Sequence, residues 1–124
     1  MFGFNECESA RDAAYDYDGN DHEAHFSHEL VAGAAAFAGM KAFEDHQRNE
    51  GRQVSHSFAK ELIAGFAGAE VDKLAETKGL DFLDREKAKH HSKRQAEHLY
   101  DEQYGRYDDY DPNATEPHPT MRRY

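Results

Sequence analysis

The sequence contains a single cysteine, no tryptophan and only three prolines, and it has no long hydrophobic run. With Cys7 as its one thiol, the chain excludes an intrachain disulfide and a zinc site built from several thiolates. No apolar stretch reaches the roughly 18 residues that a membrane-spanning helix needs, so we expect no membrane partner. The first residues lack the basic-then-apolar pattern of a signal peptide, which predicts a cytoplasmic location.

Positive charge is also scarce. The 124 residues include 25 acidic and 15 basic side chains, and the net charge is −10 with histidine neutral. Because phosphate contacts require a net basic surface, we expect no nucleic-acid partner. One basic cluster, at residues 85–94, is interleaved with acidic side chains. We expect it to pair with the acidic N-terminal region rather than with an anionic ligand.

Apolar residues recur at helical spacing through most of the chain. This spacing predicts an all-α fold, namely an antiparallel bundle of three long helices preceded by a short N-terminal helix. Gly51 is suited to end the first long helix and Ser55 or Ser57 to cap the second, while the third spans 81–104.

These elements predict three parts of the chain. We expect an acidic N-terminal segment with a short helix at 1–21, the helical bundle at 22–104, and a disordered tail at 105–124. The tail holds all three prolines and has no periodic pattern. In the second long helix, the predicted core-facing stripe consists of Val54, Phe58, Leu62, Gly65, Phe66 and Ala69, joined by Ile63, Ala67 and Leu74.

The two central helices resemble each other. When the chain is shifted by 32 residues, 26–44 aligns with 58–76 and eight of nineteen positions are identical, with the shared string F-x-x-E-L-[VI]-A-G. A duplicated helical hairpin explains this match, and two ordinary amphipathic helices with a biased composition are the alternative.

Glycine and alanine are concentrated in the same two helices. A glycine inside a helix costs about 1 kcal/mol relative to alanine, so a close approach between helix backbones is the expected compensation. We therefore predict helix-packing roles for four residues, Gly33, Gly39, Gly65 and Gly68. The small-residue strips also favour a homo-oligomer or an unknown protein partner. Insertion into a membrane interface is disfavoured, because the acidic surface repels anionic lipid.

Histidine is the residue in excess, at nine of 124 positions. The candidate metal ligands are His22, His25, His28 and Glu29, because imidazoles beside a carboxylate suit Zn²⁺, Ni²⁺ or Cu²⁺. The alternative is that these histidines are solvated or lie at helix ends. No zinc-spaced motif such as H-E-x-x-H occurs, so we expect no resident cofactor and only weak binding of zinc or another divalent metal.

Catalytic motifs are missing as well, since the sequence has no G-x-S-x-G string and no glycine-rich phosphate loop. The acidic surroundings of Cys7 are expected to raise the pKa of its thiol, which disfavours a nucleophile. Glu29 and Glu61 occupy first-turn positions, where carboxylates stabilise a helix N-terminus. We therefore expect a protein that is not an enzyme.

The block AKELIAGFAGAEVDKLAETKGLDFLDREKAKHH, within residues 8–105, resembles the fungal CipC-like antibiotic-response family, a domain of unknown function. This resemblance implies a small cytosolic protein induced by stress or antibiotics, without known catalytic residues. The helix pattern is also distantly similar to the plant ASR stress domain, which is associated with zinc and DNA. The present tail lacks the long histidine and lysine tracts of that domain.

The sequence thus favours a non-enzymatic stress- or antibiotic-response protein that acts through helix-mediated association with itself or with a partner. The alternative function is a metal-binding or small-ligand-binding protein that uses histidines and carboxylates.

Overall fold

The computed structural model describes residues 3–15, 28–78 and 82–123. Its elements are, in chain order, α1 (Phe4–Tyr15), α2 (His28–Glu50), α3 (His56–Lys78), α4 (Phe82–Tyr104) and the short 3-10 helix η1 (Pro119–Arg123). Within these ranges the only extended pairing is an isolated bridge between Val54 and Tyr110. The predicted all-α class is therefore confirmed. None of the described helices is long and apolar enough to cross a membrane.

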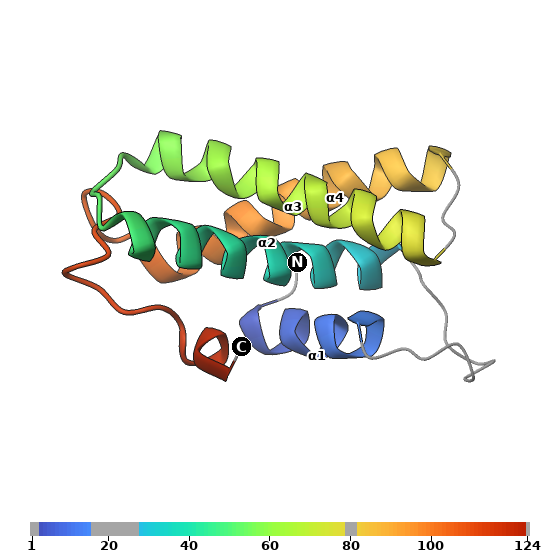
Figure 1. Ribbon diagram of the computed structural model, residues 1–124, viewed down its shortest axis with the longest axis horizontal. Helices are drawn as coiled ribbons and strands as arrows, with labels where there is room; N and C mark the ends of the chain where they lie inside the picture. The colour runs from blue at the N-terminus through green and yellow to red at the C-terminus, as the bar shows by residue number, and fades with distance from the viewer. Residues whose placement is uncertain (1–2, 16–27, 79–81, 124) are drawn as a thin grey trace.

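The three long helices lie side by side (Figure 1). Helix α2 packs against α1, α3 and α4, whereas α3 packs mainly against α2 and α4. After α4 the chain returns along the bundle, so that η1 lies beside the start of α1 (Figure 1).

Local signals set the boundary between α2 and α3, as the sequence predicts. Gly51 has a φ of 71°, and its N–H donates a 2.8 Å hydrogen bond to the Gln47 carbonyl, which closes α2. Glycine adopts this left-handed conformation without a steric penalty. The Ser55 hydroxyl accepts a 3.2 Å bond from the N–H of Phe58 and so caps α3.

Most of the circumference of α2 is buried, because three helices surround it. Its small residues bring one of these neighbours very close. A Cβ added to Gly39 would lie 2.7 Å from both Cα and N of Ala67, so the backbones of α2 and α3 nearly touch at this point. Gly39, one of the four glycines with a predicted packing role, lies at this contact, and Gly33 is buried on the same helix.

The prediction for Gly65 is wrong. This residue is exposed, and an added Cβ would have nothing within 4 Å. Gly68 is buried, but the nearest group to its added Cβ is the Lys93 side chain, at 3.2 Å, rather than another backbone. A flexible lysine stem covers Gly68, so no close helix contact requires a glycine there.

The predicted core-facing stripe of the second long helix is wrong in part, because some of its residues face outward. Phe58 is 47% exposed, and Ala69 is exposed like Gly65. Ile63, Ala67 and Leu74 of the stripe are buried as expected, and the buried side of α3 is completed by Ala59, Gly68, Val71 and Ala75. The helix carries apolar residues on both sides, so that periodicity cannot distinguish the core-facing one.

The C-terminal segment differs from the predicted disordered tail over 105–124. The Tyr110 side chain is fully buried, and Thr120 and Met121 are each 2% exposed. The His118 ring stacks on Phe4 with ring centroids 3.9 Å apart, which joins the segment to α1. Buried aromatic side chains and Met121 hold this segment against the helices, although the segment contains few aliphatic residues.

Candidate functional site

The most unusual buried group is the carboxylate of Glu44 on α2, which is 1% exposed. It accepts hydrogen bonds from the hydroxyl of Tyr104 on α4 and, at 2.6 Å, from that of Tyr110 in the C-terminal segment. Arg48 Nε lies 3.3 Å from the same carboxylate, one helical turn away. A buried carboxylate requires such partners, since removal from water is otherwise very costly.

The pKa values in this cluster show how tightly its protons are held. Burial raises the pKa of Glu44, although the two tyrosine hydroxyls and Arg48 oppose that rise. Burial, and then the negative charge of Glu44, raise the pKa of both Tyr104 and Tyr110. The tyrosines therefore stay protonated as donors, and the cluster serves to anchor three parts of the chain.

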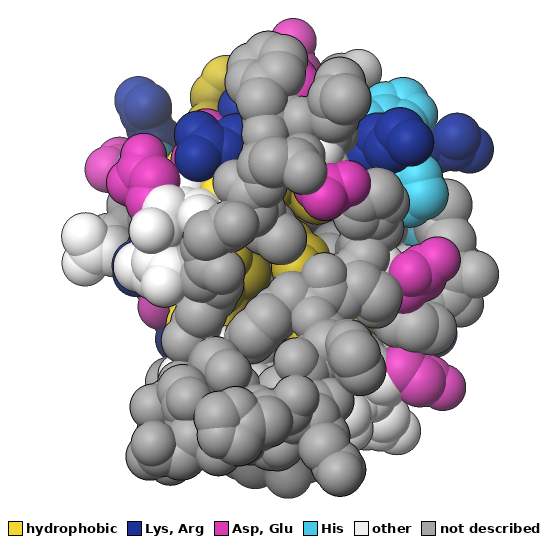
Figure 2. Space-filling view, turned by 90° about the vertical axis from the view of Figure 1, so that its right-hand side faces the viewer, with side chains coloured by type: hydrophobic (Ala, Val, Ile, Leu, Met, Phe, Trp, Pro, Cys, Tyr) yellow, Lys and Arg dark blue, Asp and Glu magenta, His cyan; other side chains and the backbone are white. Residues whose placement is uncertain are grey.

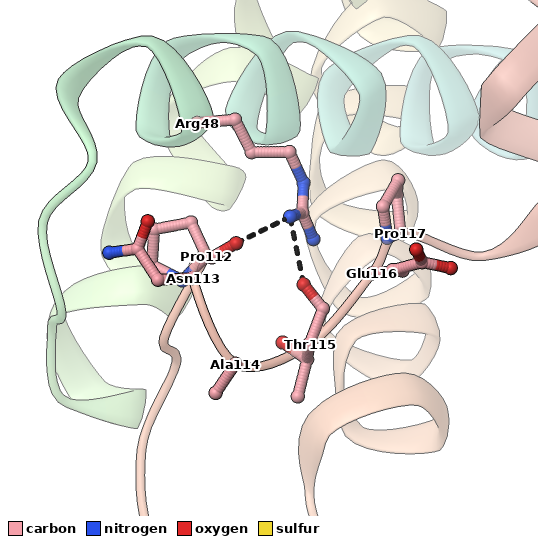
Figure 3. Close-up of a pocket in the computed structure, with 7 residues that line it drawn as sticks. All are labelled: Arg48, Pro112, Asn113, Ala114, Thr115, Glu116 and Pro117. Atoms are coloured by element: carbon pink, nitrogen blue, oxygen red, sulfur yellow. Dashed lines mark hydrogen bonds between the residues drawn. The ribbon is translucent and has the colours of Figure 1, made fainter.

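Arg48 extends this anchor to the chain beyond α4. Its Nη1 donates to the carbonyl oxygens of Pro112, at 2.9 Å, and Thr115, at 2.8 Å, and its Nη2 donates to the Tyr104 hydroxyl at 3.1 Å. Figure 3 shows the guanidinium pointing into the turn formed by these residues. The open pocket here is lined by Arg48 and residues 112–117. The guanidinium in this pocket donates to two backbone carbonyls and to the Tyr104 hydroxyl. Arg48 therefore fastens the C-terminal segment to α2.

A histidine fixes the same segment to the start of α3. His56 Nε2 lies 2.6 Å from the Tyr107 carbonyl, which only accepts, so this nitrogen carries the proton. His56 Nδ1 then accepts from the Tyr100 hydroxyl at 2.5 Å. Both ring nitrogens are occupied, which leaves neither one to bind a metal in this arrangement.

The predicted metal ligands are not brought together by the described structure. His22 and His25 lie outside the described residues. His28 is the first residue of α2, and Glu29 is exposed in its first turn. Within the described ranges no group of three histidine, cysteine or acidic residues is arranged to hold a metal ion. The metal site therefore stays a prediction.

The basic cluster of α4 pairs in part with an acidic residue of α3. Asp72 of α3 accepts from Lys89 Nζ at 3.1 Å, and Arg85 Nη1 lies 3.9 Å from the same carboxylate. At the end of the molecule shown in Figure 2, lysine, arginine and histidine side chains gather at the upper right, with acidic side chains below them. Much of the acidic N-terminal region lies outside the described residues, so the predicted pairing with that region stays a prediction.

The second notable surface is the outward side of α3, which we call the α3 outer face. Phe58, Gly65 and Ala69 are exposed on it, and Leu62 and Phe66 are only partly buried. The His46 ring of α2 lies at its edge, 5.9 Å from the Phe66 ring. A solvent-facing row of this kind is typical of a surface that meets another protein.

Sequence reasoning assigned these α3 residues to the core and gave Glu44 no role beyond its place in the repeat. An available signal for the first was the presence of apolar residues on both sides of α3. A signal for the second was the position of Glu44 one helical turn before Arg48.

The comparisons with known proteins identify one relationship. A family model described as "Virulence factor CipC-like" matches residues 11–103. No curated protein and no solved structure matches this chain. The likeness to the plant ASR domain stays a prediction.

Proposed function

Because this chain belongs to the CipC-like family, we propose that it is a cytoplasmic stress- or antibiotic-response protein that acts through association with another protein and not through catalysis. The α3 outer face is the surface that associates. The observation that carries this proposal is the exposure of Phe58, at 47%, in line with Gly65 and Ala69 on one helix.

Physical chemistry supports this assignment. Single exposed apolar side chains are common, but a continuous row on one helix is exposed at a cost, and covering it stabilises a complex by about 25 cal/mol for each Å² buried. Amphipathic helices commonly bind partners by placing residues at i, i+4 and i+7 into a complementary surface. Phe58, Leu62, Gly65 and Ala69 follow that spacing.

The non-catalytic part of the proposal is supported by the state of the buried polar groups. Glu44, Tyr104 and Tyr110 are bonded to one another, and Arg48 is bonded to backbone carbonyls. These groups stabilise the fold in their present arrangement, whereas a general acid or base needs access to a substrate proton.

We also propose that the bundle is antiparallel and that α2 and α3 derive from a duplicated hairpin. Support comes from equivalent positions that are buried in both helices, Val31 with Ile63 and Ala35 with Ala67. The two copies then diverged in their surroundings, since α2 acquired α1 as a third neighbour.

Site-specific photo-crosslinking in cells tests the proposed function. A photoreactive phenylalanine analogue replaces Phe58 in one variant, and in the control it replaces Tyr107, an aromatic residue that is 40% exposed outside the α3 outer face. We expect protein adducts from position 58 and none from position 107. The absence of adducts at position 58, or equal yields at both positions, contradicts association through this face.

A second candidate function is binding of a divalent metal by His22, His25, His28 and Glu29. It is favoured by the histidine spacing and by the exposed position of Glu29 at the start of α2. Calorimetric titration of the tag-free protein with Zn²⁺ tests it. A saturable site of about micromolar affinity or tighter supports a specific metal site, and weaker uptake rules it out.

A further inference from the structure

We propose that the partner of the α3 outer face is the same face of a second copy of this chain, with the two α3 helices antiparallel across a two-fold axis. This inference rests on the proposed function, because it names the partner of the surface already assigned. Three observations lead to it: a missing helix neighbour, complementary charges, and space for a close approach.

The first observation is the difference between the two repeated helices. Gly33, Ala34 and Phe37 of α2 are buried. The equivalent residues of α3 are, in the same order, Gly65, Phe66 and Ala69. Gly65 and Ala69 are exposed, and Phe66 is partly buried. Helix α2 has three helical neighbours, whereas α3 has two principal ones. These positions are thus covered by neighbouring helices in α2 but left uncovered in α3. This difference predicts that a helix binds to the α3 outer face.

The second observation is the placement of two charged residues. Glu61 and Lys73 are both exposed on α3, and neither forms an ion pair in the part of the chain that the structure describes. In an antiparallel pair centred at the level of residue 67, Glu61 of each copy faces Lys73 of the other. The same two-fold axis places Gly65 opposite Ala69 of the second copy. One axis therefore satisfies both the charges and the small residues.

The third observation is the space around the centre of this pairing. A Cβ added to Gly65 meets nothing within 4 Å, and Ala69 projects only a methyl group. Small residues at a crossing point allow two helix axes to approach closely. Phe58 and Leu62 add apolar area to the contact, and the same axis places them opposite Glu76 and Asp72 of the second copy.

Charge reversal tests this geometry without disturbing the core, because both charged residues are exposed. Sedimentation of the full chain should show a wild-type dimer. We expect Glu61→Lys or Lys73→Glu alone to weaken dimerisation about tenfold, because each change creates two like-charge contacts across the axis. Glu86→Lys, at an exposed site on α4 away from this face, is the matched control and leaves the dimer unchanged.

Mixing the two single variants gives the decisive result. A heterodimer of Glu61→Lys with Lys73→Glu has both charge contacts restored, so differently labelled copies should associate with each other as tightly as the wild type. Dimers that show no such preference overturn the antiparallel pairing. A wild-type chain that stays monomeric, while position 58 crosslinks to a different protein, overturns self-association and leaves the proposed function standing. Absence of any crosslink contradicts the proposed function itself.

Discussion

The Tyr110 hydroxyl donates a 2.6 Å hydrogen bond to Glu44 Oε1, and the two residues are 66 positions apart in the chain. Tyr104 donates to the other oxygen of the same carboxylate. This arrangement ties α2, α4 and the C-terminal segment to one buried charge.

We expect Glu44→Ala to destabilise the fold by about 3–5 kcal/mol, because it leaves two buried tyrosine hydroxyls and Arg48 without their shared acceptor. Glu76→Ala is the matched control, since Glu76 is the repeat equivalent of Glu44 and is exposed. Urea unfolding of both variants measures the difference. Equal free energies of unfolding for the two variants show that the buried carboxylate has no special role.

The stability of the protein should depend on the ionisation of Glu44. Its pKa is raised in the folded state, mainly by burial, so the folded protein holds this proton more tightly than the unfolded chain does. The stabilising contribution is complete below the ordinary glutamate pKa, about 4.3, and is lost as the pH rises through the raised value. The free energy of unfolding of the wild type, measured relative to that of Glu44→Gln, should therefore fall as the pH increases from about 4. A difference that grows with pH contradicts the raised pKa.

Gly39 and Gly65 should respond in opposite directions to substitution by alanine. At Gly39 a Cβ would lie 2.7 Å from the backbone of Ala67, so we expect Gly39→Ala to destabilise by about 1–3 kcal/mol. At Gly65 nothing lies within 4 Å, so we expect Gly65→Ala to stabilise the dilute protein by about 0.5–1 kcal/mol through helix propensity. Thermal unfolding measures both. A loss of stability in Gly65→Ala would indicate that Gly65 is tightly packed, as the sequence alone suggests.

The C-terminal segment should contribute to stability through the hydroxyl of Tyr110. We expect Tyr110→Phe to cost about 1.5–3 kcal/mol, because the ring is retained and only a bond to a charged acceptor is lost. Tyr107→Phe is the control, since Tyr107 is 40% exposed, and should leave the stability nearly unchanged. If Tyr110→Phe and Tyr107→Phe unfold at the same urea concentration, the C-terminal segment does not pack through Tyr110 as described.

Cys7 should be inert in the folded protein. Its side chain is fully buried, and burial, together with the negative charges of Glu6 and Glu102, raises the pKa of its thiol to about 12. Since the thiolate is the reactive form, we expect a disulfide reagent at pH 8 to modify Cys7 only at the rate of opening or unfolding. Complete and rapid modification in denaturant provides the reference. The same fast rate without denaturant contradicts the burial.

The helical class and the boundary between α2 and α3 were predictable from sequence, because caps, left-handed glycines and apolar spacing are local properties. The raised pKa of Cys7 was predictable in direction from its acidic neighbours, although burial is the larger cause. The close approach at Gly39 agrees with the expectation that helix glycines permit close backbone contact, whereas its partner Ala67 is known only from the structure.

Only the tertiary structure decided which side of α3 faces the core, because that helix has apolar residues on both sides and the choice depends on how α2 and α4 meet it. Likewise, Glu44 and Glu76 are equivalent in the repeat, yet one is buried and the other is exposed. The difference comes from Tyr104 and Tyr110, which lie 60 and 66 residues after Glu44 and supply the hydrogen bonds that allow a carboxylate to leave water. No residue spacing along the chain predicts the contact of these tyrosines with Glu44, since it forms only when α4 and the C-terminal segment fold back onto α2.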